Sequence, residues 1–178
     1  MKFRSIGPAN ISGRIADIAV NPANPSEYYL AVASGGVWKT TNHGNTYSPI
    51  FDNEGSYSIG CVTMDPNNSS VIWIGTGENN NQRSVAYGDG VYKSLDGGQS
   101  WKNMGLKNSE HISKIIVDPK NSNIVYVSAY GPLWSKGGER GVYKSIDGGV
   151  NWERIFFVSD NSGMADLIMD PNDNSVLY

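Results

Sequence analysis

This sequence has little cysteine, no long apolar run and no strong charge bias. Cys61 is the single cysteine among 178 residues, so a framework of intrachain disulfides is excluded. No apolar run approaches the roughly 18 residues of a membrane-spanning helix, so no membrane span is expected. The formal net charge is only -3, which argues against a nucleic-acid partner bound through its phosphates.

Motifs for metal or cofactor chemistry are also missing. The two histidines, His43 and His111, lie far apart in the sequence, and no His, Cys and Asp cluster has the spacing of a zinc site. No calcium-binding loop with alternating oxygen ligands occurs, and no glycine-rich phosphate loop precedes a helical pattern. The sequence therefore predicts no metal site and no cofactor.

Turn residues and internal repeats are abundant instead. Of the 178 residues, 21 are glycine and 8 are proline. One motif occurs three times, as GVWKTTNHGNTY at 36–47, GVYKSLDGGQSW at 90–101 and GVYKSIDGGVNW at 141–152. A second motif, an apolar run that ends in Asn-Pro or Asp-Pro, occurs at 14–22, 58–66, 111–119 and 163–171. One structural unit therefore recurs about every fifty residues.

Each unit contains four short runs rich in β-branched and aromatic residues, which predict four strands. In the third unit these runs are Ile112–Val117, Ile124–Val127, Gly141–Ser145 and Trp152–Phe156. No stretch has helical periodicity. Four strands per unit of this length are typical of one blade of a β-propeller. The predicted fold is all-β: a propeller segment of four-stranded antiparallel blades.

The units divide the chain into about three full blades and two partial ones. Because propellers close with about 4–8 blades, we expect either an N-terminal fragment of a larger ring or a half-ring that pairs with a second copy. The remaining blades or that copy are thus expected partners. The predicted segments are an isolated outer strand at 1–13, blades at 14–52, 53–106 and 107–158, and a truncated blade at 159–178.

The glycine-rich turns resemble the Asp-box, Ser/Thr-x-Asp-x-Gly-x-Ser/Thr-Trp. Ser94–Trp101 fits fully, Ser145–Trp152 departs at one position, and the turn at 40–47 has an asparagine and a tyrosine in place of the aspartate and tryptophan. The aspartate is expected to accept backbone N–H bonds across its turn, and the tryptophan to pack on the hairpin. The residues given this structural role are Asn42, Tyr47, Asp96, Trp101, Asp147 and Trp152.

By this motif the chain resembles bacterial Asp-box, or BNR-repeat, propeller proteins similar to the VPS10/sortilin domain. Proteins of that group are often labelled BNR-repeat glycosyl hydrolases. The resemblance implies a secreted or periplasmic protein. In the xyloglucan-cleaving enzymes with this motif, a catalytic aspartate stands two residues before the first blade's Gly-Gly, where this chain has Ala33.

Functional residues are expected on the face opposite the Asp-box turns. Strands alternate in direction, so the loops after each second strand and after each fourth strand share that face, and these loops are the long ones. Arg14, Ser58, His111 and Gly163 align at the start of successive first strands, near the propeller axis. The candidate ligand-binding residues are Arg14, Glu78, Arg83, His111, Trp134, Glu139 and Arg140.

Two functions fit these residues. The favoured hypothesis is a non-catalytic scaffold that binds a protein, peptide or glycan, because no complete catalytic set is recognisable and Ala33 replaces the expected aspartate. The alternative is a glycoside hydrolase acting on a polysaccharide. Hydrolysis needs two carboxylates about 5–5.5 Å or 6.5–9.5 Å apart. Glu78 and Glu110 are the only pair considered for it.

Overall fold

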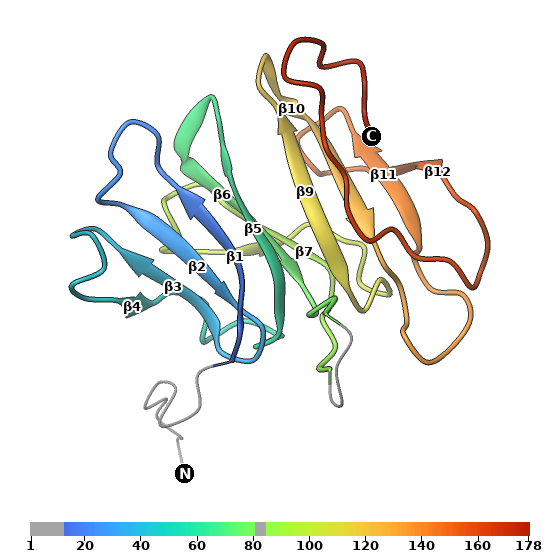
Figure 1. Ribbon diagram of the computed structural model, residues 1–178, viewed down its shortest axis with the longest axis horizontal. Helices are drawn as coiled ribbons and strands as arrows, with labels where there is room; N and C mark the ends of the chain where they lie inside the picture. The colour runs from blue at the N-terminus through green and yellow to red at the C-terminus, as the bar shows by residue number, and fades with distance from the viewer. Residues whose placement is uncertain (1–12, 81–84) are drawn as a thin grey trace.

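The computed structural model describes residues 13–80 and 85–178, and these form three four-stranded sheets with no helix that could cross a membrane (Figure 1). The first sheet holds β1 (Ile15–Val20), β2 (Tyr28–Val32), β3 (Gly36–Thr40) and β4 (Ser48–Pro49). The second holds β5 (Ile59–Asp65), β6 (Asn68–Thr76), β7 (Val91–Ser94) and β8 (Lys102–Asn103). The third holds β9 (Ile112–Asp118), β10 (Asn121–Ala129), β11 (Gly141–Ser145) and β12 (Glu153–Phe156).

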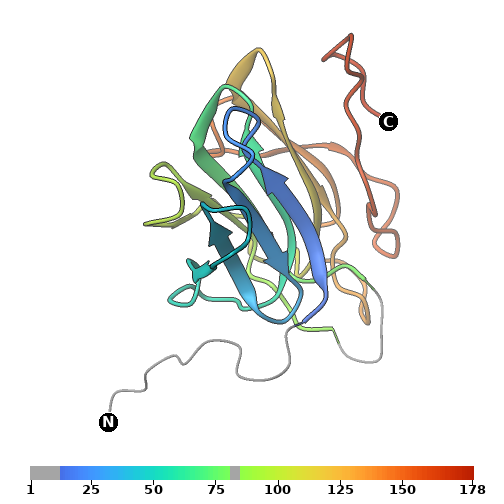
Figure 2. The ribbon, with the colours of Figure 1, turned by 60° about the vertical axis from the view of Figure 1, so that its left-hand side comes forward.

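Each sheet is an antiparallel meander in which neighbours in sequence are neighbours in space. The predicted all-β class and the four-stranded antiparallel units are therefore confirmed. The first strands β1, β5 and β9 lie next to one another, so the sheets stand side by side around a common edge (Figures 1 and 2). The outer strand predicted at 1–13 lies, apart from Gly13, outside the described residues, as does Arg83.

Two apolar cores fill the space between the sheets. Between the first and second sheets, Tyr29, Phe51 and Ile72 are almost fully buried. Between the second and third, Trp73 and Ile112 are fully buried. Removal of this apolar surface from water is the main force that joins successive sheets.

The two ends of the array are only partly covered. Ile15 and Ile18 on β1 are about half exposed, because no sheet packs on that side of β1 among the described residues. On the other side, Leu167 packs with Tyr126 and Val142 of the third sheet. The segment at 168–178 folds back on itself through mutual backbone hydrogen bonds of Ile168 and Tyr178, at 3.0 and 2.8 Å. This hairpin stands where the sequence predicts the first strands of a fourth blade.

The turns between the third and fourth strands are held by their aspartates. The Asp96 carboxylate accepts hydrogen bonds from the backbone N–H groups of Gln99 and Ser100, both at 2.9 Å, and from the Ser100 hydroxyl at 2.6 Å. Asp147 accepts equivalent bonds from the backbone and the side chain of Asn151 at 2.9 and 2.7 Å. Glycines with positive φ, such as Gly97 at 69°, complete the turns.

The tryptophans that end these turns reach further than predicted. The Trp101 indole donates a 2.7 Å hydrogen bond to the Ile50 carbonyl of the first sheet, and the Trp152 indole donates a 2.8 Å bond to the Met104 carbonyl of the second. Each tryptophan thus links its own hairpin to the preceding sheet. The sequence predicted packing on the hairpin but not this hydrogen bond, which gives the indole N–H an acceptor in the preceding sheet.

These hydrogen bonds make the hairpins sensitive to acid. Bonds from Ser100, Ser94 and Gln99 lower the pKa of Asp96 to about 2, and bonds from Asn151 and Ser145 lower that of Asp147 to about 2. Because the folded-state pKa lies below the unfolded value of about 3.9, the carboxylates stabilise the fold at neutral pH. That contribution is lost as the pH falls from about 4 to about 2.

We therefore expect Asp96→Asn to lower the melting temperature at pH 7 and to lower it much less at pH 2. Thermal unfolding of both proteins across this range measures the difference. Asp160→Asn, which changes an exposed aspartate outside the hairpins, is the matched control and should have little effect at either pH. If Asp96→Asn lowers the melting temperature equally at pH 7 and pH 2, the ionised Asp96 carboxylate does not stabilise the hairpin as described.

Candidate functional site

The loops divide between two faces of the array. On one face the aspartate hairpins contact the beginnings of the second strands, as in the 2.8 Å bond from the Gly97 N–H to the Ser70 carbonyl of β6. On the opposite face, the loops after the second strands contact those that lead into the next sheet, as in the 2.7 Å bond from the Gly88 N–H to the Glu110 carbonyl. We call this second face the loop face. It carries all the described candidate ligand-binding residues.

An ion pair between two sheets lies on the loop face. Glu78, which follows β6, is fully buried and pairs with the guanidinium of Arg14, which precedes β1. The Glu78 backbone N–H donates to the Ser58 hydroxyl at 3.0 Å. The Arg14 side chain is 47% exposed, so one side of the pair reaches the surface. The structure thus fixes a carboxylate beside an accessible cation.

Ala33, the position of the missing aspartate, adjoins this pair. Its backbone N–H donates a 2.9 Å hydrogen bond to the carbonyl of Arg14. The Ala33 side chain is fully buried. Ala33 and Glu78 thus contact the same residue, Ala33 through the Arg14 backbone and Glu78 through the Arg14 guanidinium.

Glu110 lies on a loop that touches the Glu78 loop. The Glu110 carbonyl accepts a 2.7 Å hydrogen bond from the Gly88 N–H, and it packs against the Cα of Gly77. Glu110 itself has a φ of 58°, which is uncommon for a residue with a side chain. The two glutamates considered from the sequence are thus carried by loops in direct contact.

His111 is buried just beyond this contact. Both nitrogens of its ring lack a hydrogen-bond partner among the described residues, as does the neighbouring Ser109 hydroxyl. The ring lies 5.9 Å from that of Tyr87, between centroids. Burial lowers the pKa of His111 to about 4, so its imidazole is neutral at pH 7 and can accept or donate a hydrogen bond.

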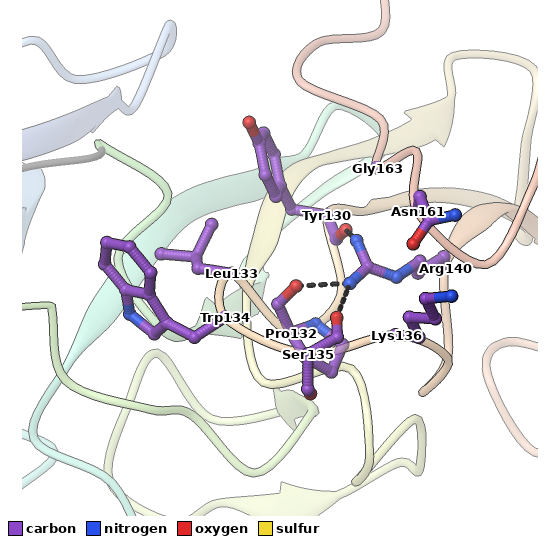
Figure 3. A pocket seen from close by; sticks show the side chains of 9 residues that line it. All are labelled: Tyr130, Pro132, Leu133, Trp134, Ser135, Lys136, Arg140, Asn161 and Gly163. Atoms are coloured by element: carbon purple, nitrogen blue, oxygen red, sulfur yellow. Dashed lines mark hydrogen bonds between the residues drawn. The ribbon is translucent and has the colours of Figure 1, made fainter.

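Arg140 has a different role from the one predicted. It is buried, and its guanidinium donates to four backbone carbonyls of the loop that precedes it: 3.0 Å to Tyr130, 2.6 Å to Ser135, 2.8 Å to Gly137, and a further bond to Pro132. Figure 3 shows the bonds to Tyr130, Pro132 and Ser135. These acceptors leave Arg140 little capacity for a ligand. It holds the loop at 130–139 in shape.

Glu139 also stabilises this loop. Its carboxylate accepts a 2.7 Å hydrogen bond from the Asn108 N–H, and its own N–H donates to the Asn108 carbonyl at 3.1 Å. The sequence alone did not indicate that Glu139 and Arg140 form hydrogen bonds with backbone groups of this loop and of its neighbour. Glycine at 131 gave a partial signal, because a side chain there would overlap the Arg140 side chain.

Trp134 stands at the tip of the same loop with its side chain 68% exposed. In Figure 3 its indole points away from the Arg140 guanidinium. The loop borders a hollow of about 450 Å³. The residues that line it are Tyr130, Pro132, Leu133, Trp134, Ser135, Lys136, Arg140, Asn161 and Gly163.

Several residues of the loop face were not among the predicted site residues. The Ser58 hydroxyl accepts a hydrogen bond from the Glu78 N–H, and Tyr87 and Ser109 lie beside the buried imidazole of His111. Ser58 could have been predicted as a site residue, because it aligns with Arg14 and His111 in the repeats. Within 13–80 and 85–178, no three His, Cys, Asp or Glu side chains are grouped to hold a metal ion.

Two curated relatives are similar to this chain. A xyloglucanase of Hypocrea jecorina is 27% identical over 177 residues, which cover 92% of this chain and 20% of that protein. A probable oligoxyloglucan-reducing end-specific xyloglucanase of Neosartorya fischeri is 26% identical over 156 residues, 78% of this chain and 17% of that protein. The chain thus spans about a fifth of the length of these relatives. No family model matches it.

A solved structure supports the architecture. The crystal structure of an ancestral GH74 enzyme superposes with a TM-score of 0.74 at 24% identity, over 97% of this chain and 22% of that one. This likeness confirms the predicted propeller fold. The favoured function was wrong, however, because both curated relatives are named as xyloglucanases. The hydrolase alternative is the better supported of the two hypotheses.

Proposed function

We propose that the protein containing this chain is a glycoside hydrolase that cleaves a xyloglucan-type polysaccharide on the loop face. The observation that carries the proposal is the similarity to a xyloglucanase along 92% of the chain. The fixed carboxylate of Glu78 on that face supports it. The remaining blades would complete the ring and the substrate cleft.

Glu78 is the proposed catalytic carboxylate of this chain. Position 33 offers no carboxylate, and Glu78 pairs with the residue that is hydrogen-bonded to Ala33. The Arg14 guanidinium pairs with the Glu78 carboxylate, which would act as a nucleophile or as a base that activates water. Glu110, on the adjoining loop, is the proposed proton donor to the leaving sugar.

Further parts of the proposal concern the protein as a whole. The Ser94–Trp101 and Ser145–Trp152 hairpins support membership of the Asp-box group, including its sortilin-like members. A polysaccharide substrate is found outside the cell, so we propose a secreted or periplasmic protein. A carbohydrate is the proposed ligand.

Release of reducing ends from xyloglucan by the full-length protein tests the activity. We expect hydrolysis of xyloglucan, and Glu78→Gln should lower kcat by about 10²–10⁴-fold, because an amide neither attacks nor takes up a proton. Glu153→Gln changes an exposed glutamate on β12, away from the loop face, and should leave kcat unchanged.

Two results would count against this function. Full-length protein that releases no sugar from xyloglucan or from any other polysaccharide would refute hydrolysis itself. Active protein whose Glu78→Gln variant retains kcat would refute the assignment of the carboxylate only.

A further inference from the structure

The tip of the loop at 130–139 carries an exposed tryptophan that has no part in the proposed catalysis. Trp134 is a large aromatic residue on the loop face, and it is 68% exposed. An exposed indole presents a broad apolar surface and one N–H donor. Such a side chain at a surface is typical of a binding residue.

The loop that carries Trp134 is unusually well fixed for a loop of its length. The buried Arg140 guanidinium occupies its interior and binds four of its carbonyls. The Gly137 N–H donates to the Asp160 carbonyl at 3.0 Å, and Glu139 bonds to Asn108 on the other side. The loop is thus tied to the segments that enter the third sheet and leave it.

The hydrogen bonds that brace this loop also favour binding at its tip. A braced loop holds its tip in one position before a ligand arrives, so little conformational entropy is lost on binding. Arg140 uses its guanidinium hydrogen bonds inside the loop. Its bonds to Pro132 and Ser135 fix the two residues that lie on either side of Leu133 and Trp134.

The hollow beside the tip has the size of a small-ligand site. Its volume of about 450 Å³ falls within the roughly 300–1,000 Å³ of ligand pockets. Tyr130, Leu133 and Trp134 contribute apolar surface, while Lys136 and Asn161 contribute donors and an acceptor. Rings with apolar faces and hydroxyl edges, as in a pyranose, match this combination.

From these observations we propose that Trp134 and the adjoining hollow form a glycan-binding subsite. One pyranose ring of the polysaccharide stacks on the indole, and the adjoining part of the glycan chain bonds to Lys136 and Asn161 in the hollow. The subsite holds the chain of the substrate at a distance from the reacting bond. This inference rests on the proposed function for the class of its ligand.

Binding of a xyloglucan oligosaccharide to the full-length protein tests the subsite. Each variant is combined with Glu78→Gln, so that the probe is not consumed. We expect Trp134→Ala to weaken binding at least about tenfold, as for an aromatic hot spot, and Trp134→Phe to retain most of the affinity. Leu95→Ala, which truncates a side chain of similar exposure on the hairpin face, is the matched control and should change nothing.

The outcomes separate the subsite from the catalytic function. Unchanged affinity in Trp134→Ala, with xyloglucan still hydrolysed by the protein with Glu78 intact, overturns the subsite and leaves the hydrolase standing. Loss of folding in Trp134→Ala, seen as a lower melting temperature, would place Trp134 in a protein contact instead and also overturns it. A protein that neither binds nor cleaves any glucan refutes both proposals together.

Discussion

Among Gly→Ala substitutions on the loop face, Gly77→Ala is expected to destabilise the fold most. Gly77 has a φ of 83°, where an L-residue is strained, and its Cβ would overlap the carbonyl oxygen of Glu110. Backbone from two adjacent sheets meets at this point, so neither partner can move alone. We expect a loss of about 3 kcal/mol or more in the free energy of unfolding, because strain and overlap add.

Gly137→Ala is the matched control. Gly137 has a similar φ of 80°, but a Cβ there would meet no atom within 4 Å. Its cost should therefore be conformational alone, about 1 kcal/mol. Denaturant unfolding of the two variants separates the close contact from the backbone strain. Equal losses of unfolding free energy in Gly77→Ala and Gly137→Ala would show that Gly77 and Glu110 are not in the contact described.

The Gly77 variant should also lose activity beyond its loss of stability. The substitution displaces the loop of Glu78 from the loop of Glu110, and a displacement of about 1 Å can cost about 10²-fold in rate. Folded Gly77→Ala protein at low temperature should thus cleave xyloglucan poorly, whereas Gly137→Ala should remain active.

Trp73→Ala is expected to destabilise the fold strongly by opening the core between the second and third sheets. Trp73 is fully buried, stacks edge-to-face on Trp152 at 6.4 Å between ring centroids, and has the Lys93 ammonium 4.6 Å from its ring centroid. Truncation of such a residue costs about 3–5 kcal/mol.

The repeat supplies a control for this substitution. Tyr126 is the equivalent residue of the third sheet and has Lys144 over its ring at 5.3 Å. It is covered by the C-terminal segment rather than by a complete sheet. Tyr126→Ala should therefore cost less than Trp73→Ala in denaturant unfolding. A larger loss at Tyr126 would contradict the description of the two cores.

The repeat made the fold predictable from the sequence. Three copies of one motif, about fifty residues apart, defined the strands, and Gly141–Ser145 was predicted at its observed bounds. The aspartate turns were predictable for the same reason, because their hydrogen bonds are local. The reach of Trp101 to Ile50 was not, since it depends on how two sheets pack.

The site was less predictable because it is built from the irregular loops. Alignment of the repeats placed Arg14 and His111 near the axis, but the pairing of Arg14 with Glu78 joins residues 64 positions apart. Charge alone suggested that Arg140 binds a ligand, whereas the conformation of its loop assigns it an internal role. Loops without periodicity carry no pattern from which such contacts could be predicted.

Hydrogen exchange of the full-length Glu78→Gln protein, with and without a xyloglucan oligosaccharide, tests most directly whether the loop face is the site of action. Slower exchange is predicted in the backbone at 85–90, 107–111 and 130–140. The aspartate hairpins at 95–100 and 146–151, on the opposite face, should be unaffected. Protection of the hairpins instead, or no protection anywhere under saturating oligosaccharide, would contradict the assignment of glycan cleavage to the loop face.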